Sequence, residues 1–241
     1  MLSNRSLRHA LQRGISMVEL MVGIAVGLFL VAGATTVFVT LLGNSRQLLV
    51  EARVNQDLRA TADVISRDLR RAGYWDNALS GTIAVGTAGT TILNPYVPIT
   101  MSGSAQVEYL FSRDANNTLN TNESFGFRRA VDGTTGRGVI QMKTDSTPTW
   151  QTLTDPSVLD IAANGLSIVQ TATVVPVGSA CAKACPPPAG ATWTCPNAPT
   201  LTLRQYDVTI TGTAVADARI TRTLQTRARV RNDQAAGSCP A

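Results

Sequence analysis

Histidine is almost absent from this chain of 241 residues, because the single one is His9, close to the N-terminus. Nucleophilic chemistry that pairs a serine or cysteine with a histidine base is therefore excluded from the rest of the chain. Glycine-rich loops that follow a strand and open a helix, as phosphate-binding loops do, are also missing. The sequence therefore predicts no catalytic activity and no cofactor.

Aromatic side chains make up only 5% of the sequence and lysine is rare, although 44% of the residues are hydrophobic. Much of this hydrophobic content lies in one block near the N-terminus, and the remainder is rich in Thr, Ala, Gly and Asn. Such a composition is typical of turns and of strands with one solvated face. It predicts a mostly extended, exported domain rather than a cytosolic enzyme.

Cysteine does not occur before Cys181, which excludes a lipoprotein signal, and the four cysteines are Cys181, Cys185, Cys195 and Cys239. An even number of cysteines in an exported domain favours disulfides, here two, with three possible pairings left open. The alternative is a zinc site, because Cys181 and Cys185 have a ligand-like spacing. The body of the chain has no histidine and a run of prolines follows Cys185, so we predict disulfides and no metal.

Acidic residues are absent from positions 1–14, which carry Arg5, Arg8 and Arg13. The 23 residues from Leu20 to Leu42 then carry no charge. As a helix this segment is roughly 35 Å long, enough to cross a hydrocarbon core of about 30 Å. The basic leader places residues 1–14 in the cytoplasm and the body outside the inner membrane. Without the leader arginines the chain keeps 18 basic and 16 acidic side chains, so no specific nucleic acid is expected as a partner.

One carboxylate, Glu19, precedes this apolar run directly. A charge at the centre of a membrane helix costs about 3 kcal/mol on insertion scales, and less near the end of the helix, where the side chain can reach the interface. A secretory signal has a shorter apolar region and a small-residue cleavage site after it. A plain membrane anchor gives no reason for a carboxylate at this position.

The basic leader, Gly14 and the following Ile15-Ser16-Met17-Val18-Glu19-Leu20 resemble the class III signal of type IV pilins and pseudopilins. The resemblance implies that prepilin peptidase cuts between Gly14 and Ile15 and that the new N-terminus, Ile15, is methylated. It also implies that Glu19 docks the subunit in the membrane, by neutralising the α-amino group of a neighbouring subunit. Two departures from the family pattern are Ile15, where Phe or Met is usual, and Thr36, where proline is often found.

The helical pattern continues beyond the apolar block. Apolar residues recur at helical spacing on one face: Val54, Leu58, Ala62, Ile65, Leu69 and Ala72. We predict one helix from about Ile15 to Ala72, with a possible bend at Gly43-Asn44-Ser45 and an end at Gly73. Basic side chains close this helix, at Arg67, Arg70 and Arg71. These arginines could contact phosphate groups. The favoured interpretation is a solvated helix end, because aspartates are interleaved with the arginines.

The segment from Ser66 to Trp75 contains RDLRRAGY, which resembles the RDLRxAGY segment of the PilW-type minor pilins. This resemblance implies a place in the complex that initiates the type IV pilus, or fimbrium, and forms its tip. The implied partners are prepilin peptidase, other minor pilins, the major pilin and a tip adhesin. The protein would lie first in the inner membrane and then in the pilus at the cell surface. The alternatives are a J-type pseudopilin of a type II secretion system and a membrane-anchored exported binding or enzyme domain.

Beyond Gly73 the alternation of apolar and polar residues predicts strands. The core-facing positions are Val107, Tyr109, Phe111, Leu166, Ile168, Tyr206, Val208, Ile210, Ile220, Leu224, Ala228 and Val230. The last two runs predict an antiparallel hairpin across residues 213–218, with Arg227, Arg229 and Arg231 on its other face. The predicted fold class is therefore α+β and pilin-like, with a long helix packed on an antiparallel sheet. Its parts are the leader 1–14, the membrane or filament-core half 15–42, the amphipathic half 43–73 and the body 74–241.

The stretch from Asp114 to Glu123 is rich in side-chain oxygens. Such a loop could bind calcium, although it lacks the EF-hand pattern. Asn and Asp are turn-forming residues, so a loop held by its own hydrogen bonds is the favoured interpretation.

Overall fold

The computed structural model describes residues 14–77, 84–85, 94–116, 118–144 and 150–240. The leader arginines Arg5, Arg8 and Arg13, and His9, lie outside the described residues. The chain divides into two compact units, Met1–Leu49 and Val50–Ala241. The second unit is called the body below.

A single helix, α1, runs from Met17 to Arg71 and contributes to both units. It continues without interruption through Gly43-Asn44-Ser45. Hydroxyl groups within it donate to carbonyls three or four residues earlier, as Thr40 Oγ1 does to the Thr36 carbonyl at 2.9 Å. These bonds keep polar side chains satisfied within the helix itself. The predicted helix is confirmed, and it begins two residues later than expected.

The two parts of α1 differ in what surrounds them. Every residue from Ile15 to Leu49 is exposed, including large apolar side chains such as Phe29, which is 80% exposed. In the body, Val54, Leu58 and Ile65 are buried completely or almost completely. The predicted apolar face therefore does pack on the body, whereas the apolar block before it is left uncovered.

The segment RDLRRAGY forms the end of α1. Gly73 adopts a φ of +72°, the left-handed conformation that favours glycine after the last helical turn. Asn232 Nδ2 donates to the Ala72 carbonyl at 3.2 Å, and Asn94 Nδ2 donates to the Gly73 carbonyl at 2.8 Å. Carbonyls at a helix end have no partner within the helix, so segments from two distant parts of the body hold this end in place.

The described strands form two antiparallel sheets and one short parallel pair. The first sheet has the order β2-β3-β4-β5-β6, with β2 Ile99–Met101, β3 Gln106–Leu110, β4 Ser124–Val131, β5 Gly138–Lys143 and β6 Trp150–Thr152. In the second, β9 Thr200–Ala214 pairs with β7 Leu159–Asp160, β8 Leu166–Pro176, β10 Thr221–Arg229 and β11 Gln234–Ala236. The parallel pair joins β1 Ala84–Val85 to β12 Ser238–Cys239. Two short 3-10 helices, Thr121–Glu123 and Gly178–Ala180, complete the described elements.

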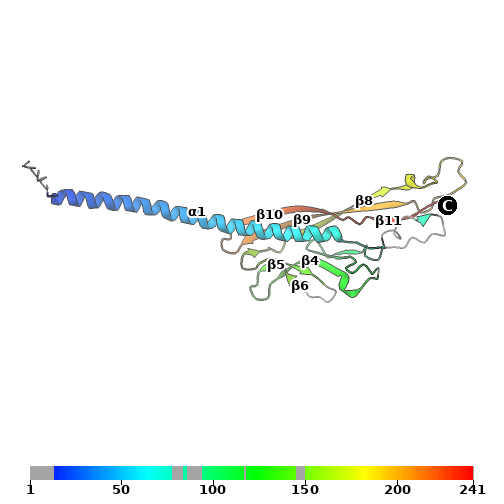
Figure 1. The fold of residues 1–241 in the computed structure, drawn as a ribbon, viewed down its shortest axis with the longest axis horizontal. Helices are drawn as coiled ribbons and strands as arrows, with labels where there is room; N and C mark the ends of the chain where they lie inside the picture. Colours follow the sequence, from blue (N-terminus) through cyan, green and yellow to red (C-terminus); the bar gives the residue numbers. More distant parts are fainter. Residues whose placement is uncertain (1–13, 78–83, 86–93, 117, 145–149, 241) are drawn as a thin grey trace, which may run out of the picture. The chain divides into compact units, whose positions relative to one another are not determined.

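One hydrophobic core joins the second part of α1 to both sheets. In the view of Figure 1, β4, β5 and β6 lie on one side of this helix segment, and β9 and β10 lie on the other. The predicted alternation is confirmed at Val107, Tyr109 and Phe111, which are at most 3% exposed. The predicted hairpin is confirmed as well, because β9 and β10 pair in antiparallel register with Thr213 opposite Thr221. The α+β, pilin-like fold is therefore present, with two antiparallel sheets in place of one.

All four cysteines form disulfides. Cys181 bonds to Cys239, with a Cα–Cα distance of 5.5 Å, and Cys185 bonds to Cys195, with a Cα–Cα distance of 5.8 Å. Cys181 and Cys185, the pair considered for zinc, therefore belong to different disulfides. The first disulfide ties strand β12 to a loop 58 positions earlier in the chain, whereas the second closes a local loop.

Removing the long-range disulfide by the double change Cys181→Ser and Cys239→Ser is expected to loosen the segment between these residues. In the chain-entropy model a loop of this length corresponds to about 4 kcal/mol of stability, and the local loop closed by the other disulfide to about 2.7 kcal/mol. Limited proteolysis of the detergent-solubilised chain, followed by mass spectrometry, should show faster cleavage between residues 181 and 239. The matched control is Cys185→Ser with Cys195→Ser. Equal protease resistance of the wild-type chain and the first variant would contradict the prediction.

Candidate functional site

Glu19 lies in the first turn of α1, and Ile15 lies two residues before the helix begins at Met17. Its neighbours are exposed apolar side chains, with Met17 83% and Met21 70% exposed. A carboxylate in the first turn interacts favourably with the partial positive charge of the helix N-terminus. In the described part of the chain no cationic side chain pairs with Glu19. An acidic group therefore stands without an ion-pair partner of its own at the start of an uncovered apolar helix.

This helix is long and apolar enough to cross a membrane, by length and composition. None of the residues in its apolar window is buried within the chain. Gly14 also stands in open space, since a Cβ added there would meet no atom within 4 Å. A larger residue at position 14 would therefore fit this structure without a clash.

The body matches the family model described as prepilin peptidase-dependent protein B, over residues 47–230. The chain belongs to this family. Family membership makes it a prepilin peptidase-dependent, pilus-related protein. The match begins within α1 and ends just after β10, so Gly14, Ile15 and Glu19 lie outside it. The N-terminal motif and the family match are therefore separate observations that agree. Comparisons with curated proteins and with solved structures find no match.

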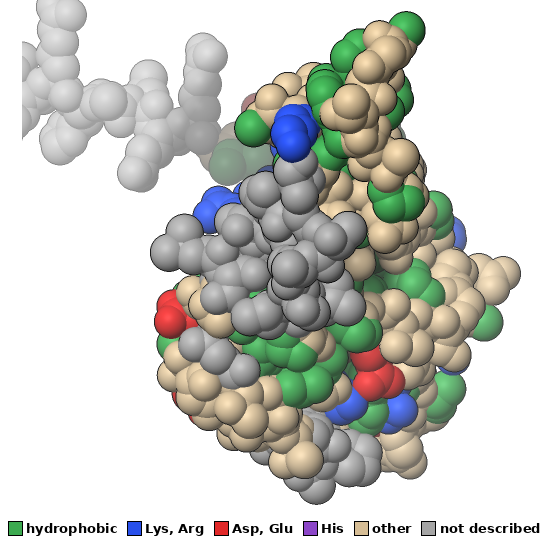
Figure 2. Space-filling view, turned by 90° about the vertical axis from the view of Figure 1, so that its right-hand side faces the viewer, with side chains coloured by type: hydrophobic (Ala, Val, Ile, Leu, Met, Phe, Trp, Pro, Cys, Tyr) green, Lys and Arg blue, Asp and Glu red, His purple; other side chains and the backbone are tan. Residues whose placement is uncertain are grey.

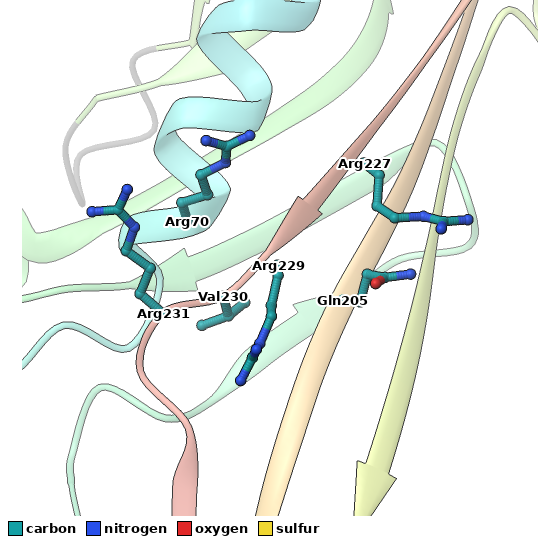
Figure 3. A pocket seen from close by; sticks show the side chains of 6 residues that line it. All are labelled: Arg70, Gln205, Arg227, Arg229, Val230 and Arg231. Carbon is teal, nitrogen blue, oxygen red and sulfur yellow. The ribbon is translucent and has the colours of Figure 1, made fainter.

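An arginine-rich surface lies at the end of α1, where the helix meets β10. We define the arginine surface by Arg67, Arg70, Arg71, Arg227, Arg229 and Arg231. Figure 3 shows the side chains from α1, β9, β10 and the residues just after β10 that line a hollow of 560 Å³. The Arg231 amide donates to the Arg70 carbonyl at 3.2 Å, which fixes the chain after β10 against the helix end. The sequence indicated the two groups of arginines separately but not their meeting.

Aspartates neutralise part of this surface. Arg227 pairs with Asp207 at 2.6 Å, Arg229 with Asp233 at 3.2 Å and Arg71 with Asp68 at 3.8 Å. Among the described residues, the side chains of Arg67, Arg70 and Arg231 form no ion pair. The surface therefore keeps a net positive charge in an exposed position.

Asp68, within the RDLRRAGY segment, contacts two groups: Arg71 on the surface and Tyr109 in the interior. Its carboxylate accepts a hydrogen bond from the Tyr109 hydroxyl at 3.4 Å. Burial raises the pKa of Asp68 above its ordinary value, although Arg71 acts in the opposite direction. This part of the motif thus holds the helix end on the first sheet.

Glu123 is fully buried, and its carboxylate closes the loop from Asp114 to Glu123. It accepts hydrogen bonds from the Arg113 amide at 2.8 Å, the Asn120 amide at 2.8 Å and the Tyr96 hydroxyl at 2.9 Å. Burial alone would raise the pKa of Glu123, but these hydrogen bonds lower it below its ordinary value. Both oxygens of one candidate calcium ligand are therefore used inside the protein.

The rest of the loop also shows bonds of its own. The Asp114 carboxylate accepts from Asn116 Nδ2 at 2.8 Å, and the Asn116 side chain accepts from the Thr118 amide at 2.8 Å. Asn117 lies outside the described residues. These bonds agree with the turn-forming interpretation, and the burial of Glu123 is the feature that the sequence did not indicate.

Proposed function

We propose that the chain is a minor pilin of the PilW type, without catalytic activity, that acts in the initiation or tip complex of a type IV pilus. The observation that carries this proposal is the lone Glu19 at the start of an uncovered apolar helix, in a chain of a prepilin peptidase-dependent family. The proposed partners are prepilin peptidase, other minor pilins, the major pilin and a tip adhesin.

The role of Glu19 follows from the electrostatics of the membrane. Cleavage between Gly14 and Ile15 creates an α-amino group in a position where a lone charge is unfavourable. A carboxylate from an adjacent subunit that pairs with this amine reduces the desolvation penalty of both groups. The pairing also fixes the axial position of one helix against the next. Glu19 therefore acts as the docking group for subunits that leave the bilayer.

The arrangement in the cell follows from the same reasoning. The basic leader stays in the cytoplasm, α1 holds the protein in the inner membrane, and the body lies in the periplasm until assembly. The disulfides fit this compartment, because disulfides persist in the oxidising periplasm. The body from Val50 to Ala241 is large for a subunit that repeats along a filament, which supports a rare position at the tip.

Mass spectrometry of the mature N-terminus tests the processing step. We expect the wild-type protein to begin at Ile15, with a methyl group on its amine. A Gly14→Val variant should retain the leader, because the change blocks cleavage while position 14 has room for the larger side chain. A Gly43→Val variant serves as the matched control, since position 43 is equally open, and it should be cleaved normally. A wild-type chain that begins at Met1 in the membrane would overturn the proposal.

A second experiment distinguishes the type II secretion alternative. Affinity purification of the tagged protein from crosslinked cells should recover pilus subunits. Recovery of secretion-system pseudopilins alone would assign the chain to that system instead. The RDLRRAGY segment and the cysteine-bearing C-terminal region support the pilus.

A further inference from the structure

Strand β8 has a free edge. Among the described strands β8 pairs only with β9, in an unbroken register from Leu166 opposite Ile210 to Pro176 opposite Thr200. The flanking bonds show which residues face β9. The Thr211 amide donates to the Gly165 carbonyl at 2.7 Å, and the Val177 amide donates to the Pro199 carbonyl at 3.0 Å.

In an antiparallel ladder, alternate residues direct both backbone polar groups toward the same neighbour. The odd-numbered residues of β8 therefore bond to β9, and the even-numbered ones point away. Ile168 uses its outward amide on the Ser104 carbonyl at 2.7 Å. Beyond it, the outward groups of Gln170, Ala172 and Val174 meet no partner within the described parts of the chain.

The same stretch is exposed on both of its faces. All side chains from Val169 to Val174 are exposed, with Val169 53% and Val174 59% accessible, whereas Ile168 is buried. The strand from Leu166 to Pro176 carries no charged residue. Apart from the grey residues, the end of the body in Figure 2 likewise shows mostly uncharged side chains. Natural edge strands are usually protected by charges, bulges, prolines or a covering segment. Within the described residues, only Pro176 at the end of β8 and the Ser104 contact at Ile168 serve that purpose.

The odd-numbered side chains of β8 lie on the face of the sheet that also carries Arg229. Thr171 and Thr173 line a hollow of 270 Å³ together with Leu203, Gln205 and Arg229. Gln205 and Arg229 also line the hollow shown in Figure 3, which includes Arg70, Arg227 and Arg231. Side chains on this face of an added strand would therefore lie on the same face of the sheet as Arg227 and Arg229, which belong to β10, two strands beyond β8. Those on the opposite face would lie beside Ala172 and Val174.

We propose that β8 is a strand-addition site for an extended segment of a partner protein in which acidic and apolar side chains alternate. Backbone hydrogen bonds to Gln170, Ala172 and Val174 supply affinity, and alternate side chains supply specificity. The carboxylates lie beside Thr171 and Thr173, on the side of the hollow that Arg229 lines. The apolar residues cover the small side chains on the other face. This proposal concerns the body alone and holds whether or not Glu19 has the role proposed above.

Binding of a synthetic peptide to the full-length chain in detergent micelles tests this proposal. The probe is a capped, fluorescent nine-residue peptide of alternating Glu and Val, and fluorescence anisotropy reports binding. Replacing every Glu by Lys should abolish binding. Ala172→Pro removes one outward amide and obstructs the edge without touching the bonds to β9. We expect this variant to weaken binding by about tenfold or more, whereas Ala172→Val, which keeps the amide, should change it by less than about twofold.

Hydrogen exchange of the wild-type chain tests the same site without a variant, so the result does not depend on whether Ala172→Pro folds. The peptide should slow exchange of the amides of Gln170, Ala172 and Val174, and leave those of Thr171 and Thr173 unchanged because these already bond to β9. Equal binding of the Lys peptide, or protection of amides elsewhere, would overturn the proposal. The absence of binding up to about 1 mM would overturn it as well, because a Kd above that value lies far outside the range of specific complexes. Dimers of the chain that dissociate in Ala172→Pro would overturn it too, because they would assign the edge to a second copy.

Discussion

Glu19→Gln is expected to abolish incorporation of this chain into filaments while leaving membrane insertion and cleavage after Gly14 intact. The substitution keeps the size of the side chain and removes only its charge. The α-amino group of a neighbouring subunit then enters the filament without a counter-ion, and an unpaired buried charge costs several kcal/mol. Because each 1.4 kcal/mol corresponds to a factor of ten in an equilibrium, the loss of incorporation should be close to complete. Immunoblots of sheared surface filaments and of the membrane fraction measure the two pools separately.

Glu51→Gln provides the matched control for this experiment. Glu51 is a carboxylate on the same helix, but it forms an ion pair with Arg222 of the body. Exposed pairs of this kind contribute about 0–1 kcal/mol, so incorporation should continue. Wild-type levels of the Glu19→Gln protein in filaments would show that the carboxylate has no docking role.

Glu123→Gln is expected to lower the free energy of unfolding by about 3 kcal/mol, because a charged acceptor of three hydrogen bonds is replaced by a group with one acceptor atom. The amide nitrogen of the glutamine is itself a donor, and it would face another donor, such as the Asn120 amide or the Tyr96 hydroxyl. The hydrogen bond at that position would be lost. Tyr96→Phe removes a single one of these bonds and should cost about 1 kcal/mol. Denaturant unfolding of the detergent-solubilised chain, followed by tryptophan fluorescence, gives both values.

The half-buried carboxylate Glu108, which pairs with Lys143 at 2.6 Å, supplies the comparison. Glu108→Gln should cost about 1.5 kcal/mol, because it weakens one charge-assisted hydrogen bond, that from Lys143. A Glu123→Gln variant as stable as Glu108→Gln would mean that the buried hydrogen bonds contribute little.

The effect of Glu123 should also depend on pH in a defined direction. Burial acts to raise the pKa of this carboxyl, but the stronger effect of its hydrogen bonds holds the folded-state pKa below the ordinary value of 4.5. The stabilisation is therefore complete above pH 4.5 and declines as the pH falls through the lowered pKa. The difference in unfolding free energy between wild type and Glu123→Gln should shrink over that acidic range. A difference that grows on acidification would contradict the assigned direction of the shift.

Much of the fold could be predicted because local pattern and packing agree in this chain. The helical spacing of Val54, Leu58 and Ile65 and the alternation of Tyr206, Val208 and Ile210 each describe a face that is buried in the structure. The division of the strands into two sheets could not be predicted, since pairing between distant strands leaves no periodic signal in a single sequence. The disulfide pairing depends on the same long-range arrangement. The sequence left three disulfide pairings open and offered Cys181 and Cys185 only as a zinc-like pair. The structure places these two cysteines in different disulfides.

The candidate sites divide in the same way. Gly14, Ile15 and Glu19 form a contiguous motif, so the sequence alone points to them, and the uncovered helix agrees with that interpretation. The arginine surface needs the contact between the end of α1 and β10, which only the fold provides. The roles of Glu123 as a buried acceptor and of β8 as a free edge depend on which residues surround them in the folded chain. The spacing of residues along a sequence does not indicate these neighbours.

The position of β9 sets the order in which the body can form. Each described strand of the second sheet bonds to β9, between Thr200 and Ala214. During synthesis β7 and β8 leave the ribosome before this shared partner exists, while the strands of the first sheet, β2 to β6, are already complete. The second sheet therefore forms late, and a nascent chain that stops before residue 200 has only one of its two sheets.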